Sequence, residues 1–252
     1  MTFNVTADAY GRFMGRYSEP LAAQFVDLVG ARPGQRALDV GCGPGALTAQ
    51  LVDRLGADAV SAVDPSASFV SAVRARLPEV DVGSAAAEHL PFPDDEFDLC
   101  LAQLVVHFMA DPVAGLAEMA RVTRPGGVVA TCVWDHAGGG GPLSVFWQAA
   151  RDLDPGVKGE AELAGARAGH LEELCAAAGL HGVEPCTLTV RVPYATFEEW
   201  WAPFGLGVGP AGGYVAGLTD TQRDALRTRC AQRLPAAPFE VSASAWCVTA
   251  RA

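Results

Sequence analysis

A short apolar run over residues 37–40 leads directly into a glycine-rich turn, Gly41-Cys42-Gly43-Pro44-Gly45, and a helical pattern follows at once. Glycine lets the backbone turn sharply and lets a ligand approach the main chain closely. In open parallel sheets, ligands bind outside the carboxyl ends of the strands, which is where this turn would lie. The order of strand, turn and helix therefore predicts an α/β fold with a binding site at the turn.

The alternation of short apolar runs and helical patterns continues to about residue 134. Such alternation is typical of βαβ units around a parallel sheet. Asp111 and Pro112 suit a helix start, as N-cap and first-turn residue. The predicted strands cover 36–40, 59–63, 80–83, 97–102 and 127–134, and the predicted helices cover 45–56, 66–76 and 111–123. Further helices are expected over 18–29, 143–153, 168–178 and much of 196–234, and further strands over 181–192 and 239–250.

The overall charge and composition restrict the class of partner. Half of the residues are apolar and 19% are charged, which fits a folded globular chain. The net charge of −11 repels phosphate backbones, and Lys158 is the only lysine, so we expect no nucleic-acid partner. The composition does not indicate an oligomeric state.

The seven cysteines form no C-x-x-C pair, and several lie in apolar runs. We expect buried free thiols in a reducing compartment, with no disulfide framework and no metal site. The N-terminus has no signal-peptide pattern, and no apolar run reaches the ~18 residues of a membrane span. A cytoplasmic protein without a membrane partner is therefore expected.

An acidic residue follows the second predicted strand. Asp64 stands 21 residues beyond Gly43, close to the spacing at which a carboxylate accepts hydrogen bonds from the ribose hydroxyls of an adenosine. A solvent-exposed loop Asp is the simpler alternative. The pattern Gly41-x-Gly43-x-x-Ala46 also satisfies a nicotinamide-dinucleotide fingerprint, but Pro44 lacks an N–H where a pyrophosphate needs several donors.

Three segments together resemble one family. They are Leu38-Asp39-Val40-Gly41-Cys42-Gly43-Pro44-Gly45, Leu90-Pro91-Phe92-Pro93-Asp94-Asp95-Glu96-Phe97-Asp98 and Arg124-Pro125-Gly126-Gly127. In order and spacing they resemble the class I S-adenosylmethionine-dependent methyltransferases, in the type 11 group of ubiquinone- and menaquinone-biosynthesis enzymes. The resemblance implies a Rossmann-like, doubly wound, seven-stranded and mostly parallel sheet. Its last strand would be antiparallel, helices would cover both faces, and a small helical cap would be present.

The resemblance also implies S-adenosylmethionine as the cofactor and assigns residues to it. Gly41, Cys42 and Gly43 would line its methionyl part, and Asp64 would hold the ribose. Ala87 and Glu88 would flank the adenine. Ala86 stands where many members carry an Asp that bonds the adenine amino group. Gln103 and Leu104 would lie near the methyl-bearing end.

The segment Tyr10–Tyr17 resembles the lid that closes over the methionyl part in this family. Arg16 is the candidate partner for the methionyl carboxylate, and Tyr10 and Phe13 would exclude water. The alternative is that these aromatic residues only dock the first helix. With the break at Gly138–Gly141, the predicted organisation is an N-terminal helical lid over 1–35 and a cofactor-binding α/β core over 36–136. Residues 137–252 would complete the sheet and add helical acceptor-binding insertions within one structural domain.

The predicted activity is in-line methyl transfer to a small apolar or aromatic acceptor. His107 and Asp135 are the candidate bases, with His136 comparable to Asp135 because both end the fifth strand. A structural role is the common one for a lone His. The candidate acceptor pocket is aromatic: Trp134, Phe146, Trp147, Trp200 and Trp201. Two other functions stay open, a nicotinamide-dependent oxidoreductase on a similar sheet and a cofactor-binding relative without transfer activity.

Overall fold

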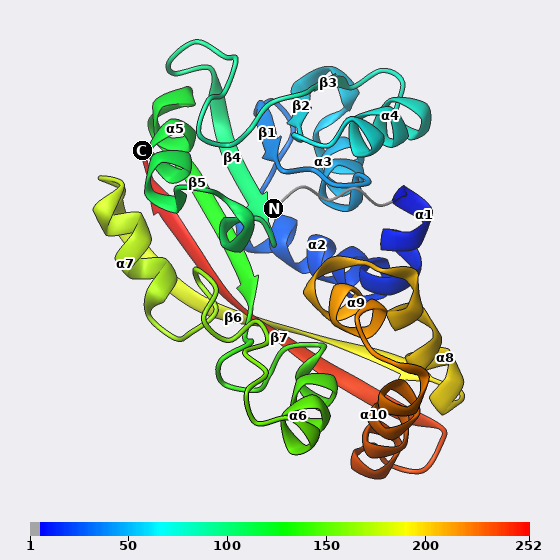
Figure 1. Cartoon of the computed structure of the whole chain (residues 1–252). Coiled ribbons are helices and arrows are strands. Elements are labelled where there is room, and N and C mark those ends of the chain that lie inside the picture. The colour runs from blue at the N-terminus through cyan, green and yellow to red at the C-terminus, as the bar shows by residue number, and fades with distance from the viewer. Residues whose placement is uncertain (1–5) are drawn as a thin grey trace.

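The computed structural model describes residues 6–252, so the first five residues of the predicted lid lie outside the described residues (Figure 1). Its seven strands form one sheet in the order β3-β2-β1-β4-β5-β7-β6. The strands are β1 (Ala37–Val40), β2 (Val60–Val63), β3 (Asp81–Gly83), β4 (Phe97–Gln103), β5 (Thr123–Trp134), β6 (His181–Tyr194) and β7 (Phe239–Arg251). The pairs among β1 to β5 are parallel, and β7 is antiparallel to both β5 and β6. This confirms the predicted sheet and its antiparallel last strand.

Helices cover both faces of the sheet. The α-helices are α1 (Ala7–Tyr10), α2 (Arg16–Leu28), α3 (Ala46–Leu55), α4 (Ala67–Arg76), α5 (Pro112–Val122), α6 (Ser144–Leu153), α7 (His170–Ala177), α8 (Phe197–Trp201), α9 (Gly209–Ala216) and α10 (Asp220–Arg233). Short helical turns of other types are η1 (Gly11–Gly15), η2 (Ala57–Ala59), η3 (Val106–Phe108) and η4 (Ala202–Leu206). The two faces of β1 show the layering: Leu38 belongs to the apolar core that includes residues of α5 and α7, whereas Ala37 belongs to the core that includes residues of α2 and α3. Strands buried on both faces read as continuous apolar runs, which explains the runs seen in the sequence.

The sheet continues beyond its parallel part as a long β6–β7 hairpin. β7 pairs with β5 only from Ala245 onward, whereas its pairing with β6 runs from Phe239. The connection between β6 and β7 carries α8, α9 and α10, which lie at the far end of the hairpin in Figure 1. Phe13 of η1 contacts Phe204 of η4, with ring centroids 5.2 Å apart. The inserted helices therefore meet the N-terminal helices over the carboxyl ends of the parallel strands.

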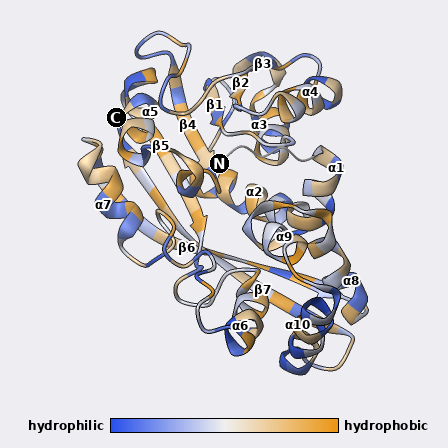
Figure 2. Ribbon diagram, viewed as in Figure 1, coloured by the Kyte–Doolittle hydropathy of each residue, from blue (hydrophilic) through white to orange (hydrophobic). Residues whose placement is uncertain are grey.

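Apolar and polar residues separate in the way this packing requires. Figure 2 shows apolar central strands and a largely hydrophilic α10, which buries only Leu226 and Cys230. The predicted bounds differ mainly at β5, which begins at Thr123 instead of 127 because Phe97 pairs with Thr123 before the register shifts. The predicted division of the chain at residues 35 and 136 stays a prediction. One continuous sheet contains strands from both sides of residue 136. Among residues 6–252, no helix has the length and apolar character needed to cross a membrane.

Candidate active site

The glycine-rich turn joins β1 to α3 and requires glycine for two reasons. Gly41, Gly43 and Gly45 have φ angles of 72°, 53° and 91°, which side chains rarely adopt. A Cβ on Gly41 would also lie 2.5 Å from Cγ2 of Val105. The N–H groups of Gly41 and Cys42 donate to the Val63 carbonyl at 2.8 and 3.0 Å, so the turn bends across the end of β2.

Asp64 follows β2 directly and connects it to the turn. Its carboxylate accepts hydrogen bonds from the N–H groups of Gly43 at 2.9 Å and Ser66 at 2.8 Å. The side chain is buried, and burial raises the pKa of Asp64 while the hydrogen bonds from Ser66 and Gly43 act in the opposite direction. These two hydrogen bonds hold the carboxylate in place. Each of its oxygens has a second lone pair, so the carboxylate can still accept hydrogen bonds from a ligand.

A cavity of about 300 Å³ lies beside this carboxylate at the carboxyl ends of β1, β2 and β4. Most of the residues predicted for a cofactor line it: Tyr10, Gly41, Gly43, Asp64, Ala86, Ala87, Glu88, Gln103 and Leu104. Phe69 and Met109 also line it and were not anticipated, because no motif distinguishes them from other apolar helix or loop residues. Glu88 has a second task, since its Oε1 accepts the N–H groups of Ala110 and Asp111.

A narrow recess continues from this cavity under the glycine turn. Asp39, Cys42, Gly43, Ser18 and Gln103 line it. Among the described residues, Ser18 Oγ and Gln103 Oε1 are buried side-chain atoms without a hydrogen-bond partner. Buried polar groups normally have partners, so these two atoms indicate a site for a polar ligand group. Ser18 was not identified from the sequence, and it lines this recess together with Gln103.

Asp39 is the buried carboxylate in the wall of the recess. Its carboxylate accepts the Thr48 hydroxyl at 2.6 Å, and burial raises the pKa of Asp39 to about 7. The Asp39 side chain is thus held in one orientation at the junction of β1 and the turn.

Leu104 separates the cofactor cavity from a second, inner cavity. It follows β4 directly and has a φ of 62°, a conformation that costs of order 1–3 kcal/mol for a side-chain-bearing residue. Its N–H donates to the Cys132 carbonyl at 2.9 Å, which holds the strained residue in place. Leu104 and Tyr10 line both cavities and the recess, so the three spaces meet at these two residues.

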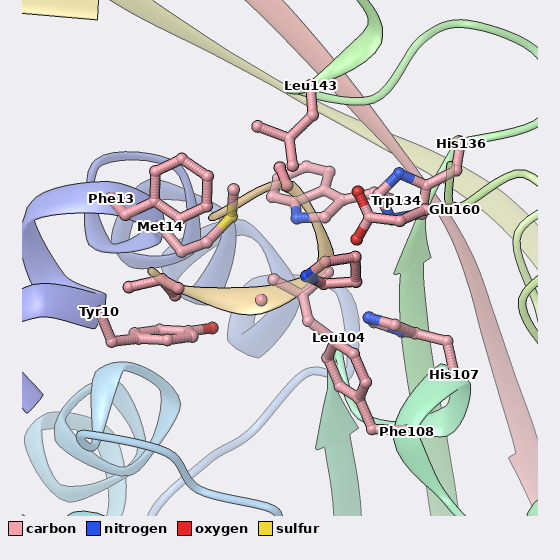
Figure 3. Close-up of a pocket in the computed structure, with 14 residues that line it drawn as sticks. Tyr10, Phe13, Met14, Leu104, His107, Phe108, Trp134, His136, Leu143 and Glu160 are labelled. Carbon is pink, nitrogen blue, oxygen red and sulfur yellow. The ribbon is translucent and has the colours of Figure 1, made fainter. Parts of the chain in front are cut away.

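The inner cavity is lined by aromatic rings and three titratable groups in addition to Tyr10. Figure 3 shows Tyr10, Phe13 and Met14 on one side and His107, His136 and Glu160 on the other. The rings of His107 and His136 have centroids 5.9 Å apart. Burial lowers the pKa of His107 well below its usual value and that of His136 to about 4, so both rings are neutral at pH 7. His107 Nδ1 and Trp134 Nε1 are buried without a partner, so a ligand here would meet two unsatisfied polar atoms.

Glu160 is the carboxylate of the inner cavity, and sequence reasoning did not identify it. It is 4% exposed and accepts the indole N–H of Trp147 at 2.7 Å. Burial raises the pKa of Glu160 to about 7, and the Trp147 hydrogen bond opposes this shift. Glu160 lies in an irregular segment between α6 and α7, where no periodic pattern indicates which side chains are buried.

Arg16, predicted to meet the methionyl carboxylate, points elsewhere. Its Nη2 donates to Glu199 at 2.7 Å and to the Pro193 carbonyl at 3.1 Å, and its guanidinium lies 4.3 Å from the Tyr194 ring centroid. It does not line the cofactor cavity or the recess. Because these partners already bind the guanidinium, the structure corrects this assignment and gives Arg16 a packing role between α2 and α8.

Asp135 also has a structural position. Its carboxylate accepts the N–H groups of Gly138 at 2.7 Å and Gly140 at 3.2 Å and the indole N–H of Trp246 at 3.2 Å. It lines neither the cofactor cavity nor the inner cavity, so its position does not suit the predicted role of a base. His107 and His136 both line the inner cavity.

The predicted aromatic pocket divides into two groups. Trp134 lines the inner cavity, and Trp147 lines an outer cavity that shares His136 and Glu160 with it. Phe146, Trp200 and Trp201 line neither cavity: Phe146 stacks on Phe204 at 4.5 Å, and both tryptophans pack around the same ring at 4.9 and 5.6 Å. These three residues therefore form the core under the inserted helices, a correction that required the three-dimensional packing.

Comparisons with known proteins show similarity to methyltransferases in the part of the chain that holds the glycine-rich turn. Residues 38–131 match the family model described as a methyltransferase domain. A demethylmenaquinone methyltransferase from Beutenbergia cavernae is 42% identical over 102 residues, which cover 40% of this chain and 42% of that protein. A malonyl-[acyl-carrier protein] O-methyltransferase from Serratia marcescens is 33% identical over 129 residues, covering 49% of this chain and 50% of that protein. The chain thus spans about half or less of the length of these curated relatives.

Solved structures show the same fold over nearly the whole chain. The YcgJ protein from Bacillus subtilis has a TM-score of 0.58 at 18% identity, covering 93% of this chain and 97% of that one. Phosphoethanolamine N-methyltransferase 2 from Haemonchus contortus, in complex with S-adenosyl-L-methionine, has a TM-score of 0.59 at 17% identity, covering 92% of this chain and 52% of that one. Residues 38–131 are thus similar to a methyltransferase domain, and demethylmenaquinone methyltransferases are among the curated relatives of the chain.

Proposed function

We propose that this chain is an S-adenosylmethionine-dependent methyltransferase that acts on a small apolar or aromatic molecule. The observation that carries the proposal is the Gly43–Asp64 hydrogen bond of 2.9 Å beside a cavity of about 300 Å³, with an aromatic inner cavity next to it. The first cavity has the size and the donor set for the cofactor. The second has the apolar lining expected for an acceptor.

The residues of the cofactor cavity would divide the ligand among them. Asp64 would accept hydrogen bonds from the ribose hydroxyls, and Ala86, Ala87 and Glu88 would border the adenine. Ser18 and Gln103 would bind the amino-acid end, since each has a buried oxygen without a partner.

The chain's own contribution to the reaction would be alignment and exclusion of water. S-adenosylmethionine, when bound, supplies a methyl group on a sulfonium whose displacement leaves a neutral sulfide. Tyr10 and Leu104 would lie beside the point of transfer and contact both ligands, because both residues line each cavity. His107 is the proposed base, since its neutral ring has a buried Nδ1 without a partner in the inner cavity.

Thermal-shift and calorimetric titrations with S-adenosylmethionine, S-adenosylhomocysteine and NAD test the cofactor. Stabilisation by the two sulfur compounds is expected, and stabilisation by NAD alone would support the oxidoreductase alternative instead. Turnover of a panel of phenols, quinols and amines, read as a product mass increased by one methylene, tests the activity. Tight cofactor binding with no turnover across the panel would favour a binding protein without transfer activity.

His107→Gln tests the proposed base on any acceptor that is turned over. A fall in kcat of about 10²-fold is expected, with S-adenosylhomocysteine affinity unchanged. An unchanged kcat would remove His107 from the mechanism.

A further inference from the structure

The inner cavity contains one ionisable carboxylate and no positive side chain to neutralise it. Among the described residues that line this cavity none is lysine or arginine, and both histidines are neutral at pH 7 because burial lowers their pKa values. Glu160 forms none of the side-chain ion pairs within 4.0 Å found in residues 6–252. Within residues 6–252, the carboxylate accepts a hydrogen bond from the neutral Trp147 indole.

Such a carboxylate is unfavourable for the fold by itself. Buried charges usually have a charged partner, and replacing them with neutral residues of similar volume is often neutral or stabilising. Ionisable groups held in this way are concentrated at binding sites. The position of Glu160 in a cavity wall therefore indicates that a ligand provides the missing partner.

The surroundings indicate the charge of that ligand. Tyr10, Phe13, Phe108 and Trp134 line the same cavity as Glu160 (Figure 3). Aromatic rings attract organic cations through their negative faces, and a carboxylate adds an opposite charge. An anionic ligand would meet Glu160 without any compensating cation. The free space, about 40 Å³, suits a compact end group such as an ammonium.

The position of Glu160 also indicates which part of the acceptor it meets. It lines the inner cavity and the outer cavity, and the exposed Arg151 also lines the outer cavity, but Glu160 does not line the cofactor cavity. Tyr10 and Leu104 occupy the boundary with the cofactor cavity. Glu160 is therefore a group for binding and selecting the acceptor, on the wall away from the methyl-transfer point.

We propose that Glu160 determines acceptor specificity by binding a protonated amine nitrogen of the acceptor inside the aromatic inner cavity. This inference rests on the proposed function, and it concerns binding only. The acceptor class is accordingly an amine-bearing molecule with an apolar body.

A matched set of probes tests the charge preference. n-Butylammonium, 1-butanol and butanoate share one chain length and differ in charge at pH 7.5, and ligand-observed NMR measures their binding to the full chain with and without S-adenosylhomocysteine. The ammonium is expected to bind about ten-fold more tightly than the alcohol, and butanoate least. Glu160→Gln should abolish the preference. Glu162→Gln, which removes a charge from an exposed position in the same segment, should retain it.

Equal binding of ammonium and alcohol to the wild type, or a preference that survives Glu160→Gln, would overturn the proposal. Glu160→Asp keeps the charge and should retain part of the preference, which separates a charge effect from a packing effect. If Glu160→Gln does not fold, the order of the three probe affinities in the wild type and in Glu160→Asp tests the proposal. Binding of S-adenosylhomocysteine to the wild-type chain is a separate readout. If the wild type does not bind it, the proposed function is contradicted, whereas the charge preference tests Glu160.

Discussion

The Gly43 N–H donates to the Asp64 carboxylate at 2.9 Å across 21 residues of sequence, so the turn after β1 and the residue after β2 form one unit. Asp64 Oδ1 accepts the Ser66 N–H in the same way. The carboxylate therefore orders both loops before any ligand arrives. Such preorganisation reduces the entropy lost on binding.

Asp64→Ala should weaken S-adenosylhomocysteine binding about ten- to one-hundred-fold, because charge-assisted hydrogen bonds contribute roughly 1.5–3 kcal/mol. Isothermal titration calorimetry measures it. Asp58→Ala, which changes an Asp of η2 outside the cavity, is the matched control and should bind normally. Undiminished binding to the Asp64 variant would remove the ribose assignment.

Gly41→Ala should lower the free energy of unfolding by about 2–4 kcal/mol, since it combines positive-φ strain with a contact of 2.5 Å to Val105. Urea denaturation measures the change. Gly34→Ala isolates the strain, because its φ is 92° and nothing lies within 4 Å of the added Cβ. The difference between the two variants reports the Val105 contact. Equal losses would show that the contact is relieved without cost.

Arg16→Ala should reduce stability by at most about 1 kcal/mol, as expected for a partly exposed ion pair. Because Arg16 bonds Glu199 instead of lining the recess, S-adenosylhomocysteine affinity should stay within about two-fold of the wild type. A calorimetric titration beside the unfolding curve distinguishes the two roles. A large loss of affinity would restore the carboxylate-binding assignment.

Glu160 should make stability depend on pH. Its pKa is raised from 4.5 to about 7 by burial, so the folded state keeps a proton between these values that the unfolded state has released. The contribution of Glu160 to the free energy of unfolding therefore falls as pH rises from about 4.5 to 7, by up to about 1.4 kcal/mol per pH unit. Above pH 7 this contribution stays constant.

Glu160→Gln lacks this titration. The free energy of unfolding of the variant minus that of the wild type should therefore rise by about 2 kcal/mol between pH 5 and 7. Thermal unfolding of both proteins across this range measures the difference, and the common effect of the other acidic groups cancels. Glu162→Gln serves as the exposed control. A difference that does not change with pH would place the pKa of Glu160 near its ordinary value.

Local patterns in the sequence predicted the fold and one half of the site. The βα order, the turn at Gly41–Gly45 and Asp64 were predicted because strand period, glycine conformation and the spacing of two strand ends depend on neighbouring residues. Nine of the predicted cofactor residues line one cavity, and all of them except Tyr10 of α1 lie at or after the carboxyl ends of parallel strands, which the sheet brings together.

The acceptor side was decided by tertiary structure. Whether Arg16 meets a ligand or Glu199 depends on a contact across 183 residues, which no local pattern contains. The burial of Glu160 and the distribution of the tryptophans between cavity and core likewise depend on how the helices between β6 and β7 meet the N-terminal helices. The sequence by itself determined where the candidate cofactor cavity lies, because that cavity is built mainly from residues that follow successive strands. Only long-range packing decided which side chains line the inner cavity, because these side chains come from segments that are far apart in the sequence and meet only in the folded chain.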